Sequence, residues 1–133
     1  MSADSVLVDT SAWIDYFRNP QSPCAIRLDR LLEEGRVLVP RVVIAELIQG
    51  ARSAKELAVV EDLLVALEVV DQSEATWLEA GYLAQELKKM GQQIPLLDCY
   101  IASIARENGS SILTLDKHFE DIRAAAGIPL FKI

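Results

Sequence analysis

Apolar residues follow two different periods along this chain. Short runs rich in β-branched residues, such as "VLV" at 6–8, have the length and composition of buried strands. Longer stretches repeat apolar residues every three or four positions, which is typical of amphipathic helices. The pattern predicts strands at 6–8, 37–39, 68–70, 112–115 and 129–131.

Helices are expected between these strands, and capping and turn residues set their bounds. Thr10 or Ser11 can cap the first helix, and Asn19-Pro20 stops it. Glycines such as Gly35 suit the C-terminal ends of helices. The predicted helices run from about Thr10 to Asn19, Pro23 to Glu34, Pro40 to about Gly50, Ala54 to Leu67, Ser73 to Met90, about Leu97 to Glu107, and Lys117 to Ala125.

Strands that alternate with helices need crossover connections too long for hairpins, and such connections join parallel strands. Helices on both faces then cover the apolar strands. We therefore expect an α/β fold, a three-layer α/β/α sandwich with a mostly parallel central sheet of four to five strands. A chain of 133 residues, 51% of them hydrophobic, suits a single domain over 1–133.

The chain is acidic, with 20 Asp and Glu against 13 Lys and Arg and a net charge of −7. This balance argues against a general electrostatic attraction to the phosphates of nucleic acids. It favours a basic partner or bound cations instead. Solubility alone is an equally good reason for the acidity.

Cysteine and histidine are scarce. Cys24 and Cys99 are far apart in the sequence, and there is one histidine, which excludes a zinc cluster of cysteine or histidine and leaves a single disulfide bridge open. The first residues do not form a targeting segment, and charged residues interrupt the most apolar run, 37–48. The sequence therefore predicts a cytoplasmic protein without a membrane segment.

Two acidic residues come directly after predicted strands. Asp9 follows the first strand, and Asp116 closes "ILTLD" before a helix. Each could serve as a turn or helix-capping residue. In a parallel sheet, however, both would lie at the carboxyl edge, which is where open α/β folds bind ligands.

Two further acidic residues lie among apolar or small residues in predicted helices. Glu46 is the only charge in "VVIAELIQG", where a carboxylate is costly unless something holds it. The alternative is that Glu46 reaches water or pairs with Arg41 or Arg52. Asp98, in "LLDCYIASIA", suits the positive end of its helix dipole, but it shares an apolar stripe. Both residues are therefore candidates for a functional site.

Four carboxylates gathered in one place would repel one another, which raises the pKa of at least one of them and destabilises the fold. A divalent cation removes this repulsion. Oxygen ligands without sulfur or imidazole favour Mg²⁺ or Mn²⁺ over Zn²⁺. Such ions activate water and neutralise phosphoryl charge, so a convergent cluster would indicate nuclease or phosphatase chemistry.

Four short motifs occur in a specific order along nearly the whole chain: "VLVDTSAWIDYF", "VIAELIQGAR" with E-L-x-x-G, "LLDCYIASIA" with D-x-x-I-A, and "ILTLDKHFEDI" with T-x-D-x-x-F. Together they resemble the PIN-domain ribonucleases, and within these the VapC-like toxins of bacterial and archaeal toxin–antitoxin modules. The resemblance implies an endoribonuclease that depends on Mg²⁺ or Mn²⁺ and acts as the toxin of a type II module.

The resemblance also implies roles for the four acidic residues, as a catalytic quartet that binds the metal. Asp9 and Asp98 look like the most direct ligands. Glu46 looks like a ligand or a base that orients water. Asp116 looks like a ligand of a second ion, either directly or through water.

Three other side chains lie close to these motifs. Ser11 and Thr114 look like hydroxyls that hold the carboxylates or the substrate phosphate, although Ser11 also suits a helix cap and Thr114 is an ordinary strand residue. His118 is interpreted as an exposed residue near the site that could contact RNA, and not as a metal ligand.

Partners follow from the same resemblance. It implies a small antitoxin whose tail packs in a groove near the site, a homodimer, and a larger assembly with the antitoxin. Apolar helical stripes are candidate surfaces for both contacts, although such stripes more often belong to a core. These stripes are Trp13, Ile14 and Phe17, and Leu57, Val60 and Leu64.

Three other functions compete with this hypothesis. In a receiver-like signalling module, Asp71 would accept a phosphoryl group while Asp9 held Mg²⁺, but Glu46 and Asp98 would have no role. A phosphatase of the haloacid-dehalogenase type needs D-x-D, and Ser11 stands where the second Asp belongs. A catalytically silent PIN-like fold is disfavoured because all four acidic residues are present.

Overall fold

The computed structural model describes residues 4–133, and these residues form seven helices and four strands. Strands and helices alternate as the sequence predicts, with most boundaries within two residues of expectation. The elements are β1 (Val6–Val8), α1 (Thr10–Arg18), α2 (Pro23–Glu33), β2 (Val37–Pro40), α3 (Arg41–Gly50), α4 (Ala54–Ala66), β3 (Glu68–Val70), α5 (Thr76–Lys89), α6 (Leu96–Glu107), β4 (Ser111–Leu113) and α7 (His118–Ala126).

The four strands form one sheet in the order β3-β2-β1-β4, and every neighbouring pair is parallel. Val6 of β1 pairs with Val37 of β2 on one side and with Ser111 of β4 on the other. All three residues of β1 are completely buried. The parallel sheet predicted from the sequence is therefore confirmed, with β1 and β2 as its two inner strands.

The expected fifth strand at 129–131 is reduced to an isolated bridge between Leu130 and Ile112. The amide of Ile112 donates to the Pro129 carbonyl at 3.0 Å, and the amide of Phe131 donates to the Ile112 carbonyl at 2.8 Å. Proline has no amide hydrogen to continue the ladder. The last segment thus follows β4 through two hydrogen bonds and does not form a full strand.

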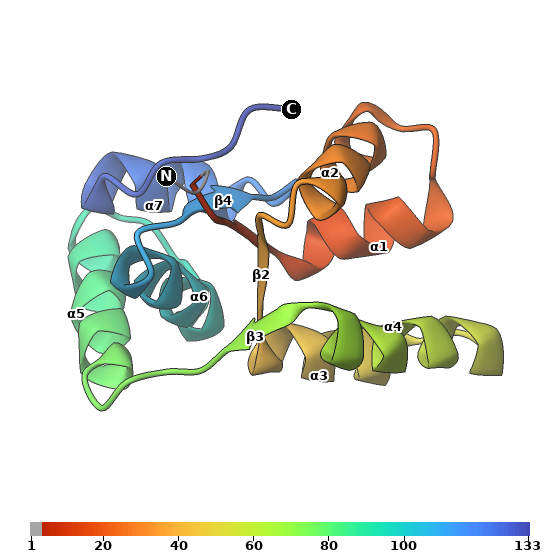
Figure 1. Ribbon diagram of the computed structural model, residues 1–133. Helices are drawn as coiled ribbons and strands as arrows, with labels where there is room; N and C mark the ends of the chain where they lie inside the picture. The colour runs from red at the N-terminus through yellow and green to blue at the C-terminus, as the bar shows by residue number, and fades with distance from the viewer. Residues whose placement is uncertain (1–3) are drawn as a thin grey trace.

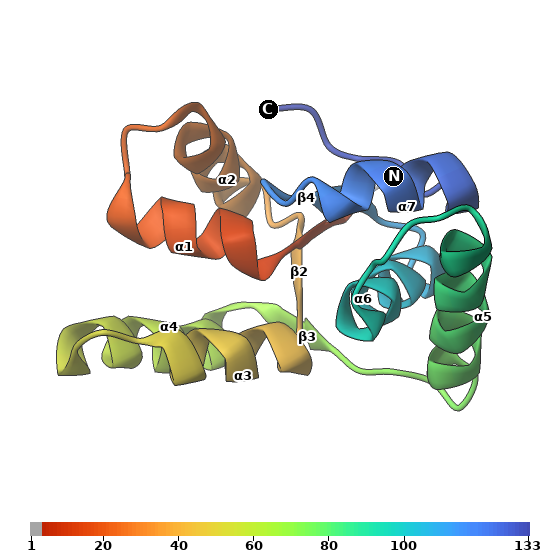
Figure 2. The same ribbon diagram turned by 180° about the vertical axis from the view of Figure 1, so that it is seen from behind.

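Helices cover the sheet on two sides (Figures 1 and 2). On one side α1 packs against α2 and α3, and α4 packs against α3. On the other side α5 packs against both α6 and α7. This arrangement confirms the three-layer α/β/α sandwich. Helices α3 and α4 run side by side and reach away from the rest of the molecule (Figure 1).

One of the helix caps predicted from the sequence is confirmed, and another was wrong. Gly35 follows α2 with a φ of +66°, the left-handed conformation expected of a C-terminal glycine. The expected cap of α1 by Thr10 or Ser11 was wrong, because Asp9 precedes the helix and makes no side-chain capping bond. The hydroxyls of Thr10 and Ser11 bind carboxylates instead.

The core includes the strands and buried residues of helices from both layers. Helix α6 contributes seven consecutive buried residues to it, from Cys99 to Ala105. Cys24 and Cys99 are both buried and both free, so they form no disulfide. Burial raises the pKa of each thiol to about 11. Over residues 4–133, none of the helices has both the length and the apolar character needed to span a bilayer.

Candidate active site

The carboxyl ends of β1 and β4 are held side by side, and this register positions the first part of the site. Val8 pairs with Leu113, and the Asp9 amide donates to the Leu113 carbonyl at 3.0 Å. The residues that follow each strand therefore emerge next to each other. Thr114 was expected to lie within the last predicted strand, but β4 ends at Leu113, so Thr114 lies just beyond the sheet.

Asp9 is a buried carboxylate, 5% exposed, that is fixed by hydroxyls from both segments. Its Oδ2 accepts hydrogen bonds from Ser11 Oγ and from Thr114 Oγ1, each at 2.9 Å. Ser11 Oγ also accepts a hydrogen bond from the backbone amide of Leu115, and Thr114 Oγ1 accepts one from the amide of Asp116, each at 2.9 Å. These bonds lock the β4–α7 loop to the start of α1 and set the orientation of Asp9.

Glu46 reaches the same region from α3. Its Oε1 accepts a hydrogen bond of 2.7 Å from Thr10 Oγ1, a contact that the sequence analysis missed because Thr10 looked like a helix cap. Burial raises the pKa of Glu46, the Thr10 bond opposes that rise, and the charges of Asp9 and Asp98 add to it. Glu46 is therefore partly buried and lies close to two other carboxylates.

Of the alternative partners of Glu46, Arg41 pairs with Asp71 instead. Asp71 follows β3, an edge strand that β2 separates from β1, and its side chain is 60% exposed. A phosphoacceptor beside Asp9 would need a neighbouring strand. The receiver-like hypothesis therefore has no support from this topology.

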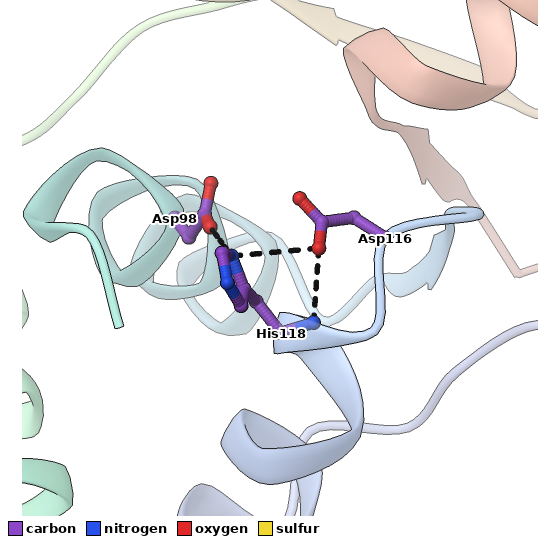
Figure 3. A group of neighbouring side chains, drawn as sticks. All are labelled: Asp98, Asp116 and His118. Carbon is purple, nitrogen blue, oxygen red and sulfur yellow. Dashed lines mark hydrogen bonds and ion pairs between the residues drawn. The ribbon is translucent and has the colours of Figure 1, made fainter. Parts of the chain in front are cut away.

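Asp98 and Asp116 complete the acidic group from α6 and from the loop before α7 (Figure 3). The side chain of Asp98 is 16% exposed. Burial is the main cause that raises the pKa of Asp98, and the charges of Asp116 and Asp9 raise it further. The hydrogen bond from His118 lowers it. Asp98 thus interacts electrostatically with Asp9, Asp116 and Glu46 at once.

His118 lies within this group, closer than the sequence indicated. Its Nδ1 is 2.8 Å from Asp98 Oδ2 and 3.4 Å from Asp116 Oδ1. The hydrogen bond to Asp98 is the main cause that raises the pKa of His118. The expected exposure is present, since the side chain is 43% exposed. Its position two residues after Asp116, at the start of α7, was the one available indication of this contact.

The structure therefore brings Asp9, Glu46, Asp98 and Asp116 to one edge of the sheet, with Ser11 and Thr114 holding Asp9. One ligand atom each from Asp98, Asp116 and His118 lies within 4.8 Å of the others. Neighbouring carboxylates raise the pKa of Glu46 and of Asp98, and a hard divalent cation fits such an oxygen-rich cluster because it offsets the repulsion.

Comparison with known proteins identifies the family. The model of the PIN domain family matches residues 6–125. Ribonuclease VapC11 of Mycobacterium tuberculosis is 29% identical over 121 residues, which are 88% of this chain and 90% of the relative. The tRNA(fMet)-specific endonuclease VapC of Shigella flexneri is 30% identical over 112 residues, which are 81% of this chain and 83% of the relative.

Solved structures agree in fold. A chain in the crystal structure of DNA-bound VapBC from Salmonella typhimurium matches with a TM-score of 0.79 and 26% identity, over 97% of this chain and 98% of that one. A chain of VapBC2 from Rickettsia felis, bound to a promoter DNA fragment, matches in fold with a TM-score of 0.76 over 95% of this chain and 96% of that one, at 21% identity. The chain therefore belongs to the PIN domain family and, within it, to the VapC-like ribonucleases.

Proposed function

We propose that this protein is an endoribonuclease that depends on Mg²⁺ or Mn²⁺, hydrolyses phosphodiester bonds in RNA and acts as the toxin of a type II toxin–antitoxin module. One observation carries the proposal. Four carboxylates, from the residue that follows β1, from α3, from α6 and from the β4–α7 loop, interact at one edge of the sheet in a chain of the PIN domain family.

The hydrogen bonds support different roles for these carboxylates. Asp9 and Asp98 are proposed as the direct metal ligands and Asp116 as a further ligand. Asp9 suits this role because two hydroxyls hold one of its oxygens in place. When bound, Mg²⁺ or Mn²⁺ would neutralise charge on the scissile phosphate and activate a water molecule.

Glu46 is proposed as the base that orients the attacking water, or as a further ligand. It accepts the proton of that water while the water oxygen bonds to phosphorus and a ribose oxygen leaves. The hydrogen bond from Thr10 favours the ionised form of Glu46 that this role needs, since burial alone favours the neutral form. The hydrogen bond from Thr10 thus helps to keep Glu46 ionised, although burial favours its neutral form.

The remaining parts of the proposal concern partners and location. Matched chains come from crystal structures of VapBC complexes, which supports a cognate antitoxin as the partner of this chain. We further propose a homodimer, a larger assembly with the antitoxin, and action in the cytoplasm, where RNA substrates occur. The names of the relatives support RNA as the substrate class.

The test is a cleavage assay on total bacterial RNA with the full chain, purified free of any antitoxin. We expect cleavage with Mg²⁺ or Mn²⁺ and none with EDTA. The variants Asp9→Asn and Asp98→Asn should keep their circular dichroism spectra and lose about a thousandfold or more in rate, because the metal supplies several kcal/mol of charge stabilisation. Sequencing of the product ends would identify the RNA.

The matched control is Asp71→Asn, which removes an acidic residue at the end of a different strand. We expect this variant to cleave RNA at the wild-type rate, because Asp71 pairs with Arg41 outside the cluster. Cleavage that persists in EDTA, or that survives Asp98→Asn, would contradict the proposal. Labelling of Asp71 by acetyl phosphate would support the receiver-like alternative.

A further inference from the structure

The imidazole of His118 occupies a position between two carboxylates, where a cation would also be held (Figure 3). Nδ1 faces Asp98 on one side and Asp116 on the other, at 2.8 Å and 3.4 Å. It is the only histidine of the chain. The family motif that predicted the acidic residues assigns no role to this side chain.

The backbone fixes the ring in this place from two directions. His118 is the first residue of α7, and its amide donates to Asp116 Oδ1 at 2.9 Å. Asp98 projects from the first turn of α6, which packs against α7. The position of Nδ1 therefore depends on the packing of two helices and does not result from a free surface rotamer.

The distances match those expected between ligands of one ion. In an octahedral shell with metal–ligand bonds of about 2.1 Å, adjacent ligand atoms are about 3 Å apart. The two separations that involve Nδ1 bracket this value, and all three candidate ligand atoms lie within 4.8 Å of one another. A protonated ring that forms ion pairs with both carboxylates would give the same two distances, so the experiments below are chosen to distinguish a metal ligand from such an ion pair.

We propose that His118 supplies a nitrogen ligand, through Nδ1, to the divalent ion held by Asp98 and Asp116, and that this ligand makes the site prefer Mn²⁺ to Mg²⁺. The inference rests on the proposed function, which requires an ion at this cluster. Without an ion, Nδ1 donates a hydrogen bond to Asp98. To bind the ion, Nδ1 would release this proton to water and offer its lone pair, and the hydrogen that remains on the ring would be on Nε2. The ring is 43% exposed, so water can accept that hydrogen.

The selectivity follows from ligand chemistry. Mg²⁺ takes oxygen ligands and retains its water, so a nitrogen donor adds little to its affinity. Transition-metal ions accept imidazole more readily, and Mn²⁺ is the member of that series that also suits carboxylates. A mixed shell of carboxylate oxygen and one imidazole nitrogen therefore favours Mn²⁺ over Mg²⁺.

The direct test is electron spin-echo envelope modulation of Mn²⁺ bound to the full chain, which detects a nitrogen atom coordinated to the metal. We expect a coupling typical of directly bound imidazole in the wild type and none in His118→Gln. Glutamine keeps a donor that can bind Asp98, so this variant separates a ligand from a hydrogen-bonding partner. The control Lys117→Gln removes the neighbouring exposed cation and should keep the coupling.

Isothermal titration calorimetry with Mn²⁺ and Mg²⁺ tests the selectivity. We expect His118→Gln to weaken Mn²⁺ binding about tenfold or more and to change Mg²⁺ binding by less than about threefold. Mn²⁺ that binds the wild type without nitrogen coupling, or equal losses for both ions, would overturn this inference and leave the proposed nuclease intact. A wild type that binds neither ion would overturn both.

Discussion

Helices α4 and α6 have similar lengths and many apolar residues, yet they occupy opposite environments. Helix α6 buries seven consecutive residues between the sheet and α5. In α4, which the structure describes in full, Val60 is the one buried residue. Val59, Leu64 and Val65 of α4 are 40%, 42% and 89% exposed. Figure 2 shows α4 beside α3 on the outside of the molecule, whereas α6 lies beside α5 on the side that faces the rest of the fold.

This contrast separates two uses of apolar residues. Those of α6 fill the core and hold Asp98 at the site, so the fold needs them. Those of α4 leave apolar area in water, which a stable core does not require. In a toxin that is inhibited by another protein, such a surface suits the partner. The stripe proposed from the sequence is thus divided, because Val60 lies in the core while Leu64 stays exposed.

The largest expected effect is on stability. We expect Ile101→Ala in α6 to lower the free energy of unfolding by about 2–5 kcal/mol, because it leaves a cavity in a packed core. Val65→Ala in α4 should change it by less than about 0.5 kcal/mol. Urea denaturation followed by circular dichroism measures both values. Equal losses in the two variants would mean that α4 contributes to the core as much as α6.

The same contrast shows what the sequence could predict. Apolar periodicity located α4 and α6 to within a few residues, because that pattern depends on neighbours along one helix. It could not tell which stripe is covered, since coverage depends on elements far away in the chain. The strand-end rule predicted Asp9 and Asp116, and the apolar surroundings of two helical carboxylates indicated Glu46 and Asp98. The contact of His118 with Asp98 depends on how α6 and α7 pack, and the position of His118 two residues after Asp116 was its one indication in the sequence.

The second effect concerns binding. We expect the double variant Leu64→Ser and Val65→Ser to keep wild-type stability and RNA cleavage but to bind the antitoxin about tenfold more weakly, because it removes apolar area from the interface. The probe is the antitoxin that co-purifies with the full chain, separated from it and titrated back by calorimetry. Met90→Ser, which changes an exposed residue at the end of α5, is the control. Unchanged affinity of the double variant would show that the antitoxin binds elsewhere.

The smallest effect concerns Asp98, the one charged residue in the first turn of α6. Burial and the charges of Asp116 and Asp9 raise its pKa in the folded protein. Ionisation of Asp98 therefore costs stability, and the cost grows as the pH rises from the usual pKa of an aspartate and is complete above the raised pKa. Without metal, Asp98→Asn should melt roughly 1–3 °C higher than the wild type.

Mn²⁺ should reverse this order. It stabilises the wild type by binding to the folded state, and it binds the variant more weakly because Asp98→Asn removes one of its ligands. Differential scanning calorimetry at pH 7, with EDTA and with Mn²⁺, measures both melting temperatures. Asp62→Asn, on the exposed surface of α4, should respond to Mn²⁺ as the wild type does. A lower melting temperature for Asp98→Asn in EDTA would mean that the helix dipole and His118 outweigh burial and repulsion. Asp98 would then stabilise α6 as the buried apolar residues do, and the acidic cluster would need no cation to be stable.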